Sequence, residues 1–268
     1  MFRWPEKILL WLLFVLLLCV PAEALEGRTL LGSSAKAKEP AGWSDRRAVL
    51  VIESFGDGDK MRERRAETKE LLGEDLKLSA LSEFLGPADF RGLRVLDVWG
   101  AEEPGSVHVW APGTDRFHRV PSGQSDDKPG HENEPSYRDA QLLDLLPRMV
   151  EELESVEVVD EEVVDGTNMA VLDVDVGDRD WPMGQRFRVW ISTDDGLLRK
   201  IETVKAGGVA RRVSVLEYTE ADGRVTATRV AVETFASKRK TIFERRDVEY
   251  DRGIPERTFS LRDLSKGN

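Results

Sequence analysis

Three histidines are the residues of this chain best suited to acid–base or metal chemistry. His108 and His118 fall in two neighbouring apolar segments, and His131 lies in the loop that follows them. Histidine titrates near neutral pH and binds zinc through a ring nitrogen. If the two segments are adjacent strands, His108 and His118 could hold a metal together with an acidic residue. Histidines on exposed strand faces are common, so we favour a structural role and predict no metal site.

Other chemical motifs fail at particular positions. Asp57 and Asp59 are spaced like the first ligands of a calcium loop. That loop then needs a ligand, a glycine and a closing glutamate where this chain has Met61, Arg62 and Thr68, so a hairpin turn fits better. The sequence has no serine elbow, P-loop or zinc-protease motif, and its carboxylates are too plentiful for one pair to stand out. We therefore predict a protein that is not an enzyme, has no catalytic residue and uses no cofactor, with a histidine-dependent hydrolase as an alternative.

The composition argues against some classes of binding partner and against cysteine chemistry. The net charge is −11, which argues against a nucleic-acid partner because such binding requires basic side chains that neutralise phosphates. The chain has a single cysteine, Cys19, in its N-terminal apolar segment. If that segment is removed, the mature chain has no disulfide, no thiolate metal site and no cysteine nucleophile.

The N-terminus has the pattern of a secretory signal. Basic Arg3 and Lys7 precede the apolar run 8–20, and Pro21-Ala22-Glu23-Ala24 supplies a small-residue cleavage site. We predict a signal peptide over residues 1–24, and hence a periplasmic protein; an uncleaved anchor is the alternative. Residues 25–42 are rich in glycine, serine and alanine without a strong period, and we predict a flexible leader there.

Most of the secondary structure that the sequence predicts, and that would position these residues, consists of β-strands. Residues 93–99, 107–110 and 116–120 are rich in β-branched and aromatic residues and are separated by proline–glycine turns, which predicts an antiparallel meander. Alternation continues from residue 156 to 261 with tight turns between segments. The charged segment 61–72 has helical propensity, but its place between two strands favours a charged edge strand.

One helix is expected among these strands. Residues 140–153 have leucines at one-sided helical spacing, and Pro147 must end or kink that helix. Without an internal repeat or a second composition class, residues 43–268 are predicted to form one domain.

Several motifs together resemble a known family. The segment Phe84 to Val120, with Pro87-Ala88-Asp89 before a strand and Val109-Trp110 before Pro112, is similar to the outer-membrane lipoprotein-sorting proteins, a LolA-like family of lipoprotein carriers. Later motifs resemble that family in the same order. They are Ser136-Tyr137-Arg138-Asp139, Val164-Asp165-Gly166, Phe187 to Ile191 with Gly196-Leu197, and Gly253-Ile254-Pro255 with Phe259. The family's N-terminal helix is only weakly evident in residues 25–42, and its Phe-Met-Gly-Ser-Asp loop is replaced by residues 123–135.

The resemblance implies a mainly β fold, an incomplete antiparallel β-barrel with a few covering helices and an apolar concave face. Exposing an acyl chain of about 16 carbons to water costs on the order of 12 kcal/mol, which such a face would avoid. From strand alternation we predict that the lipid-binding residues are Val95, Val107, Val109, Phe187, Val189 and Ile191.

The expected function is that of a monomeric carrier for an acylated lipoprotein or another lipid, moving its cargo towards the outer membrane with a membrane transporter or an outer-membrane acceptor as partner. The alternative is an accessory, protein-binding module of an envelope lipid exporter, whose core is filled and which has no lipid cavity.

Overall fold

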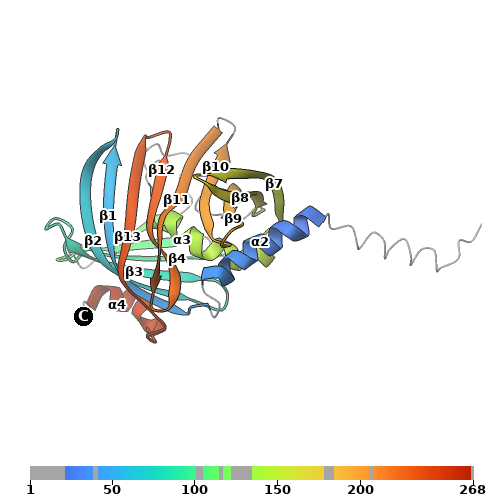
Figure 1. Ribbon diagram of the computed structural model, residues 1–268. Helices are drawn as coiled ribbons and strands as arrows, with labels where there is room; N and C mark the ends of the chain where they lie inside the picture. Colours follow the sequence, from blue (N-terminus) through green and yellow to red (C-terminus); the bar gives the residue numbers. More distant parts are fainter. Residues whose placement is uncertain are drawn as a thin grey trace, which may run out of the picture.

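The computed structural model (Figure 1) describes residues 22–38, 42–100, 105–114, 117–121, 135–177, 184–205 and 208–266. Within these ranges, one 13-stranded sheet has the order β6-β5-β4-β3-β2-β1-β13-β12-β11-β10-β9-β8-β7, with every neighbouring pair antiparallel. Its edges, β6 and β7, do not pair with each other in that order, so the sheet is an open, incomplete barrel. The predicted fold class is confirmed.

The strands are β1 (Asp45–Gly56), β2 (Asp59–Leu72), β3 (Leu78–Gly86), β4 (Arg94–Trp99), β5 (Ser106–Trp110), β6 (Phe117–Pro121), β7 (Ser155–Val164), β8 (Thr167–Asp175), β9 (Arg186–Ser192), β10 (Leu198–Lys205), β11 (Gly208–Ala221), β12 (Arg224–Thr234) and β13 (Arg239–Tyr250). The helices are α2 (Ala22–Lys38), α3 (Tyr137–Leu145) and α4 (Leu261–Lys266), with 3-10 turns η1 (Leu146–Glu152) and η2 (Glu256–Phe259).

The sheet consists of two meanders joined side by side. Strands β1 to β6 form one and β7 to β13 the other, and the pairing of β1 with β13 joins them. Three hairpins turn at Asp-Gly pairs, at residues 57–58, 165–166 and 222–223, where both residues have positive φ. Such turns match the right-handed twist of the flanking strands, and glycine adopts positive φ without steric cost. The predicted turn at residues 57–58 is therefore confirmed.

The charged segment 61–72 is a strand, as expected, but it is not at an edge. It lies in β2, which pairs with β1 on one side and with β3 on the other. Ala66, Thr68, Glu70 and Leu72 are buried at every second position, while the charged residues between them face outward. Outward ion pairs such as Arg47–Glu67, at 2.8 Å, let an interior strand carry this many charges.

Residues 25–42 are not a flexible leader, because α2 occupies most of them. Leu31 and Ser34 of α2 are fully buried, and α2 packs against β7 and η1. The helix passes so close to β7 that a Cβ on Gly27 would lie 2.7 Å from the carbonyl oxygen of Val156. Here glycine permits close packing rather than flexibility. Residues 1–21 lie outside the described part, so signal cleavage remains a prediction.

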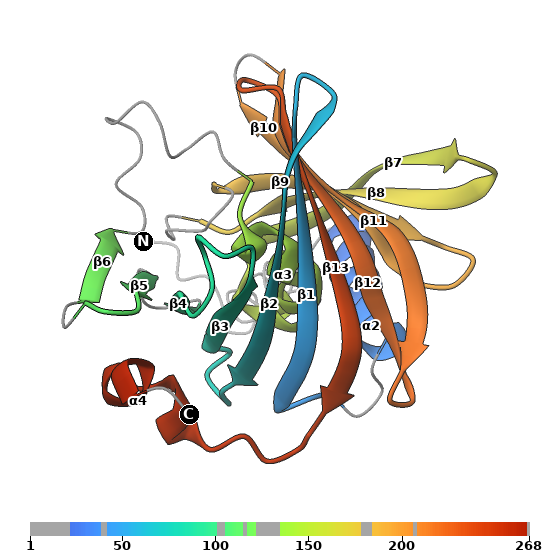
Figure 2. The same ribbon diagram turned by 90° about the vertical axis from the view of Figure 1, so that its left-hand side faces the viewer.

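Helices α2 and α3 line the inside of the sheet. Figure 2 shows α3 enclosed by the curved strands, and α2 lies on the same side near β12. The predicted break at Pro147 is confirmed, because α3 ends at Leu145 and the 3-10 turn η1 carries Pro147 in its first turn. On the outer face, α4 packs on β4 and β5, where Arg94 Nη1 donates to the Leu264 carbonyl at 3.2 Å.

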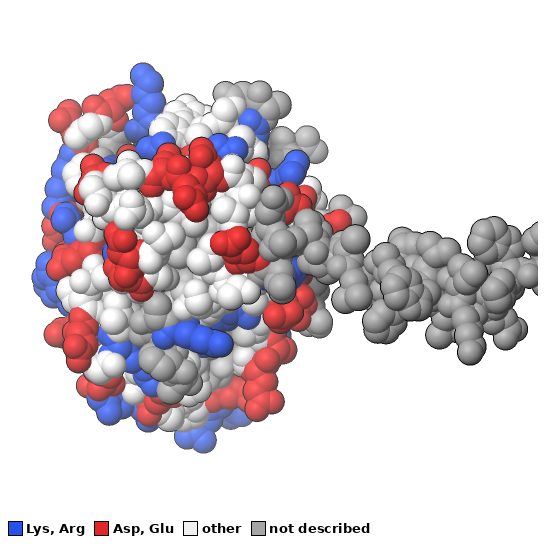
Figure 3. Space-filling view, turned by 45° about the vertical axis from the view of Figure 1, so that its right-hand side comes forward, with Lys and Arg blue, Asp and Glu red and all other residues white. Residues whose placement is uncertain are grey.

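The exposed charges are mixed in sign on the face that Figure 3 shows, where acidic and basic side chains lie among uncharged ones. Among the described residues, no helix has the length and apolar character needed to cross a membrane.

Candidate functional site

Helix α3 is buried along nearly its whole length, and its buried residues include three polar ones, Asp139, Gln141 and Asp144. Its first turn is fixed by a reciprocal cap in which Ser136 Oγ accepts from the Asp139 amide and Asp139 Oδ2 accepts from the Ser136 amide, the latter at 2.8 Å. This cap satisfies donors that the helix cannot satisfy itself. Buried polar side chains need partners, and those of α3 find them on the concave face of the sheet.

Asp144 of α3 joins two buried arginines of the sheet. Arg46 Nη1 and Arg245 Nη2 lie 3.0 Å and 3.4 Å from the same oxygen, Asp144 Oδ2. Arg46 is in β1 and Arg245 in the adjacent strand β13. Both arginine side chains are 1% exposed, so water hardly screens these pairs. Removing one member of such a group would leave an uncompensated buried charge.

A second carboxylate, Glu70 of β2, balances the charge. Its two oxygens accept from Arg46 Nε and, at 2.6 Å, from Gln141 Nε2. Gln141 Oε1 in turn accepts from Trp99 Nε1 at 3.2 Å. We call Arg46, Glu70, Asp144 and Arg245 the buried charge cluster. It combines two basic and two acidic side chains, so the cluster as a whole is neutral.

The surroundings keep both arginines protonated. Burial alone would lower the pKa of Arg46, but the carboxylates of Glu70 and Asp144 outweigh it and hold that pKa well above its usual value. Burial opposes the charge on Arg245 too, yet its pKa is raised by Tyr137, Asp144 and Glu70. Arg245 Nε donates to the Tyr137 hydroxyl at 3.0 Å, and burial raises the pKa of Tyr137 to about 12. The tyrosine therefore stays neutral, and the arginines stay positive.

Two further ion pairs attach α3 to both meanders. Arg211 Nη1 of β11 lies 2.9 Å from Asp139 Oδ1, and Arg138 Nε donates to Asp97 Oδ2 of β4 at 3.2 Å. Burial raises the pKa of both Asp139 and Asp97, and the paired arginine opposes the shift in each case. The helix is thus held from opposite sides of the sheet.

The predicted residues Phe187, Val189 and Ile191 of β9 lie on the concave face. Each is at most 2% exposed, within the same apolar core as the leucines of α3. Their neighbour Trp190 points to the outer face, where it packs with Met169 and Val171. Alternation therefore placed these side chains on the correct face. Their role in lipid binding is a prediction that the geometry permits only if α3 moves away.

The other predicted residues, Val95, Val107 and Val109, form a separate group. They share the concave face, because Val95 pairs with Val109 and Val107 pairs with Asp97, which reaches α3 through Arg138. All three are half-buried rather than buried. Seven strands separate β4 from β9 in the sheet order. The six predicted residues thus line one face at two distant places.

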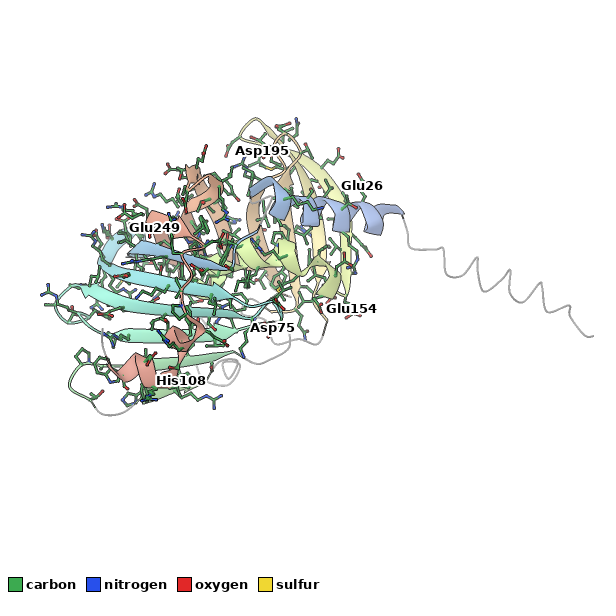
Figure 4. The ribbon with its side chains drawn as sticks, turned by 90° about the horizontal axis from the view of Figure 1, so that it is seen from below. Glu26, Asp75, His108, Glu154, Asp195 and Glu249 are labelled. Atoms are coloured by element: carbon green, nitrogen blue, oxygen red, sulfur yellow. The ribbon has the colours of Figure 1, made fainter. Side chains whose placement is uncertain are left out.

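The two histidines in the described part do not converge. His108 pairs with Arg119 and His118 with Val109, so the two side chains point to opposite faces of β5 and β6. Figure 4 shows His108 at the end of the molecule away from Glu26 of α2. Among the described residues no group of His, Cys, Asp and Glu could hold a metal ion. His131 lies outside them.

The sequence interpretation missed the buried charge cluster, although a signal for it exists. Arg46 alternates in phase with Ala48, Leu50 and Ile52, and Glu70 in phase with Ala66 and Leu72. A charged residue at a core-facing position of a strand needs a buried partner of opposite sign. Treating the charges of residues 61–72 as a solvated surface hid Glu70, and weighting only the leucines of 140–153 hid Gln141 and Asp144.

The sequence model of a family described as "-like: Uncharacterized protein" matches residues 77–266. No curated protein matches the sequence.

Solved structures share the fold. A DUF1329 family protein from Desulfovibrio piger superposes with a TM-score of 0.75 at 21% identity, covering 91% of this chain and 99% of that one. A putative outer membrane lipoprotein-sorting protein domain from Vibrio parahaemolyticus gives 0.74 at 18% identity, covering 90% and 99%. A LolA superfamily protein from Nitrosomonas europaea gives 0.65 at 14%, covering 88% and 98%. The resemblance that the motifs indicated is confirmed for the fold.

Proposed function

This chain belongs to the family whose sequence model matches residues 77–266, and we propose that it is a periplasmic carrier that shelters the acyl chains of a lipoprotein or another lipid. The observation that carries the proposal is the open sheet whose apolar concave face encloses the short helix α3. Structures with this fold include a putative lipoprotein-sorting domain. No catalytic step is part of the proposal.

Carrier function requires α3 to leave its position. Leu142, Leu143 and Leu145 are at most 1% exposed, so α3 fills the place where an acyl chain would lie. An acyl chain that replaced these leucines would restore the same apolar contacts, at ~0.8 kcal/mol per buried methylene. The helix is short and its polar contacts to the sheet are side-chain contacts, which a displaced helix can exchange for water.

The filled interior also favours a second candidate. A protein whose concave face is already packed can serve as an accessory, protein-binding module of an envelope lipid exporter. In that case α3 is a permanent part of the core, and the outer surface carries the function.

Bound lipid distinguishes the two. The full-length chain would be expressed so that the host performs any N-terminal processing, purified without detergent, extracted, and assayed for lipid by mass spectrometry. A molar ratio close to one lipid-bearing molecule per protein chain would support the carrier function. A lipid-free protein that also refuses added triacylated lipopeptide would contradict it and leave the accessory module.

Variants of β5 locate the binding face. Replacing Val107 and Val109 together by aspartate should abolish lipid retention, because it places charge on the concave face. His108→Asp is the matched control, since His108 lies between them but points to the outer face. Circular dichroism would establish that both variants fold. Equal retention by the two variants would remove β5 from the lipid site.

A further inference from the structure

We infer that the buried charge cluster is a binding site for the carboxylate of a single-chain lipid, such as a fatty acid, and that Asp144 occupies this site when α3 is in place. The inference rests on the proposed carrier function and names the chemical class of its cargo. It starts from the geometry of Asp144, whose Oδ2 lies 3.0 Å from Arg46 Nη1 and 3.4 Å from Arg245 Nη2.

The sheet supplies the whole recognition group. Arg46 and Arg245 come from neighbouring strands β1 and β13, and each is also held by the sheet itself. Arg46 Nε donates to Glu70, and Arg245 Nη1 donates to the Ala227 carbonyl at 2.7 Å. If α3 leaves, Arg245 loses the hydroxyl of Tyr137, but both guanidinium groups keep these contacts to the sheet, which hold them in position. Pre-oriented arginines are well suited to binding a carboxylate.

Among the residues that the structure describes, one donor of the cluster makes no hydrogen bond even with α3 in place. Arg46 Nη2 is buried and makes no hydrogen bond with any residue that the structure describes. A carboxylate has two oxygens that can accept about four hydrogen bonds in total. A ligand carboxylate, which is not restrained by a helix backbone, can turn to accept from Nη1 and Nη2 together. The site can therefore donate more hydrogen bonds to the carboxylate of a ligand than to the carboxylate of Asp144.

The charge balance selects against neutral lipids. With α3 in place, Arg46 and Arg245 are balanced by Glu70 and Asp144. Removal of Asp144 leaves one positive charge in excess inside an apolar barrel. An uncompensated buried charge is strongly unfavourable, so α3 is replaced most easily by a ligand that brings one negative charge. A fatty acid does so, whereas a fatty alcohol of the same length does not.

The apolar part of α3 matches the same ligand. Leu142, Leu143 and Leu145 flank Asp144 in the sequence and are buried in the core around β9. At Asp144 the helix thus presents an apolar surface beside a carboxylate, as a fatty acid does. A fatty acid in place of α3 would restore the ion pairs that Asp144 makes with Arg46 and Arg245, together with the apolar contacts of the leucines.

A binding experiment with the purified full-length protein tests the carboxylate site. It measures the retention of radiolabelled palmitate and of radiolabelled hexadecanol, with triacylated lipopeptide as a third probe. We expect palmitate to bind at pH 8 at least about tenfold more tightly than hexadecanol, because the alcohol leaves the excess charge unpaired. Equal binding of both would overturn the carboxylate site while leaving the carrier intact. Failure of all three probes would overturn the carrier function itself.

Three variants refine the test. Arg245→Met should abolish the preference for palmitate over hexadecanol. Arg211→Met is the matched control, because it breaks another arginine–aspartate pair between the sheet and α3 but lies outside the cluster, and it should keep the preference. Asp144→Asn should bind palmitate several-fold more tightly than the unaltered protein, since the internal competitor is gone. Weaker binding by Asp144→Asn would contradict the inference, as a purely structural aspartate would give that result.

Discussion

The two groups of predicted residues lie on the same face of one sheet but in different surroundings. On β9, Phe187, Val189 and Ile191 are enclosed with α3 in the main core. On β4 and β5, Val95, Val107 and Val109 keep part of their surface exposed. The difference teaches that strand alternation determines which face a side chain occupies, whereas the covering elements determine whether it is accessible. With α3 in place, Val95, Val107 and Val109 are thus partly accessible, whereas the three residues of β9 are not.

The largest expected change in stability comes from placing a charge in each of the two groups. Val189→Asp should lower the free energy of unfolding by about 4 kcal/mol or more, because Val189 is fully buried and the charge finds no partner there. Val109→Asp should cost only about 1 kcal/mol, since the carboxylate at the half-buried position can reach water. Urea denaturation followed by circular dichroism measures both. Similar losses for the two variants would mean that the groups share one environment.

The next prediction concerns α2, which is part of the cover that distinguishes the two groups. Gly27→Ala should destabilise the protein by about 1–2 kcal/mol, because the new Cβ overlaps a rigid backbone oxygen and this outweighs the gain in helix propensity. Gly32 lies in the same helix, but a Cβ there would meet only Val150 Cγ1, at 3.5 Å.

Gly32→Ala is therefore the control and should stabilise the protein by about 0.5–1 kcal/mol, as alanine does within a helix. Thermal unfolding of the two variants side by side gives the sign of each change. Stabilisation by both would show that α2 is not packed closely on β7.

The smallest expected effect on stability comes from Asp251, beside the junction of β1 and β13 that joins the two meanders. Asp251 accepts hydrogen bonds from the amide and hydroxyl of Ser44, at 2.8 Å and 3.0 Å, and pairs with Arg224. Burial alone would raise the pKa of Asp251, but these bonds outweigh it and lower the pKa to about 2. A lowered pKa means that the contribution is complete above the unfolded value near 4 and is lost as the pH falls from about 4 to about 2.

Because the Asp251 side chain is 40% exposed, solvent screening limits this contribution to about 1 kcal/mol at most. Denaturation at a series of pH values should show that the difference in stability between the unaltered protein and Asp251→Asn disappears over that interval. A difference that persists below pH 2, or that grows as the pH falls, would contradict the prediction.

Much of the sheet is encoded locally and was therefore predictable. Asp-Gly pairs fixed the hairpins, and alternation fixed the faces of β4, β5 and β9. The helix break at Pro147 followed from proline geometry. These features need only a few consecutive residues.

What the sequence did not reveal depends on partners distant in the chain. From the sequence alone, Gly27 indicates a flexible segment. Its role in close packing becomes apparent only in the structure, where β7 lies against it. Glu70 belongs to a strongly charged segment and is distinguished only by its phase with Ala66 and Leu72. Pairing of Arg46 with Asp144 links residues nearly 100 positions apart, and no local pattern contains that information. For the same reason, the interior position of β2 was not predictable from its own residues.

The joining of β1 to β13 has a consequence for how the molecule is made. Arg46 pairs in register with Tyr250, so the first strand synthesised waits for the last one before the two meanders can close. Until then, β1 has an unpaired edge, and Arg46 lacks its neighbour Arg245 and the surrounding barrel. Contacts of such large sequence separation make folding slow and leave intermediates prone to aggregate. We therefore expect the nascent chain to depend on protection by chaperones until its final strand has emerged.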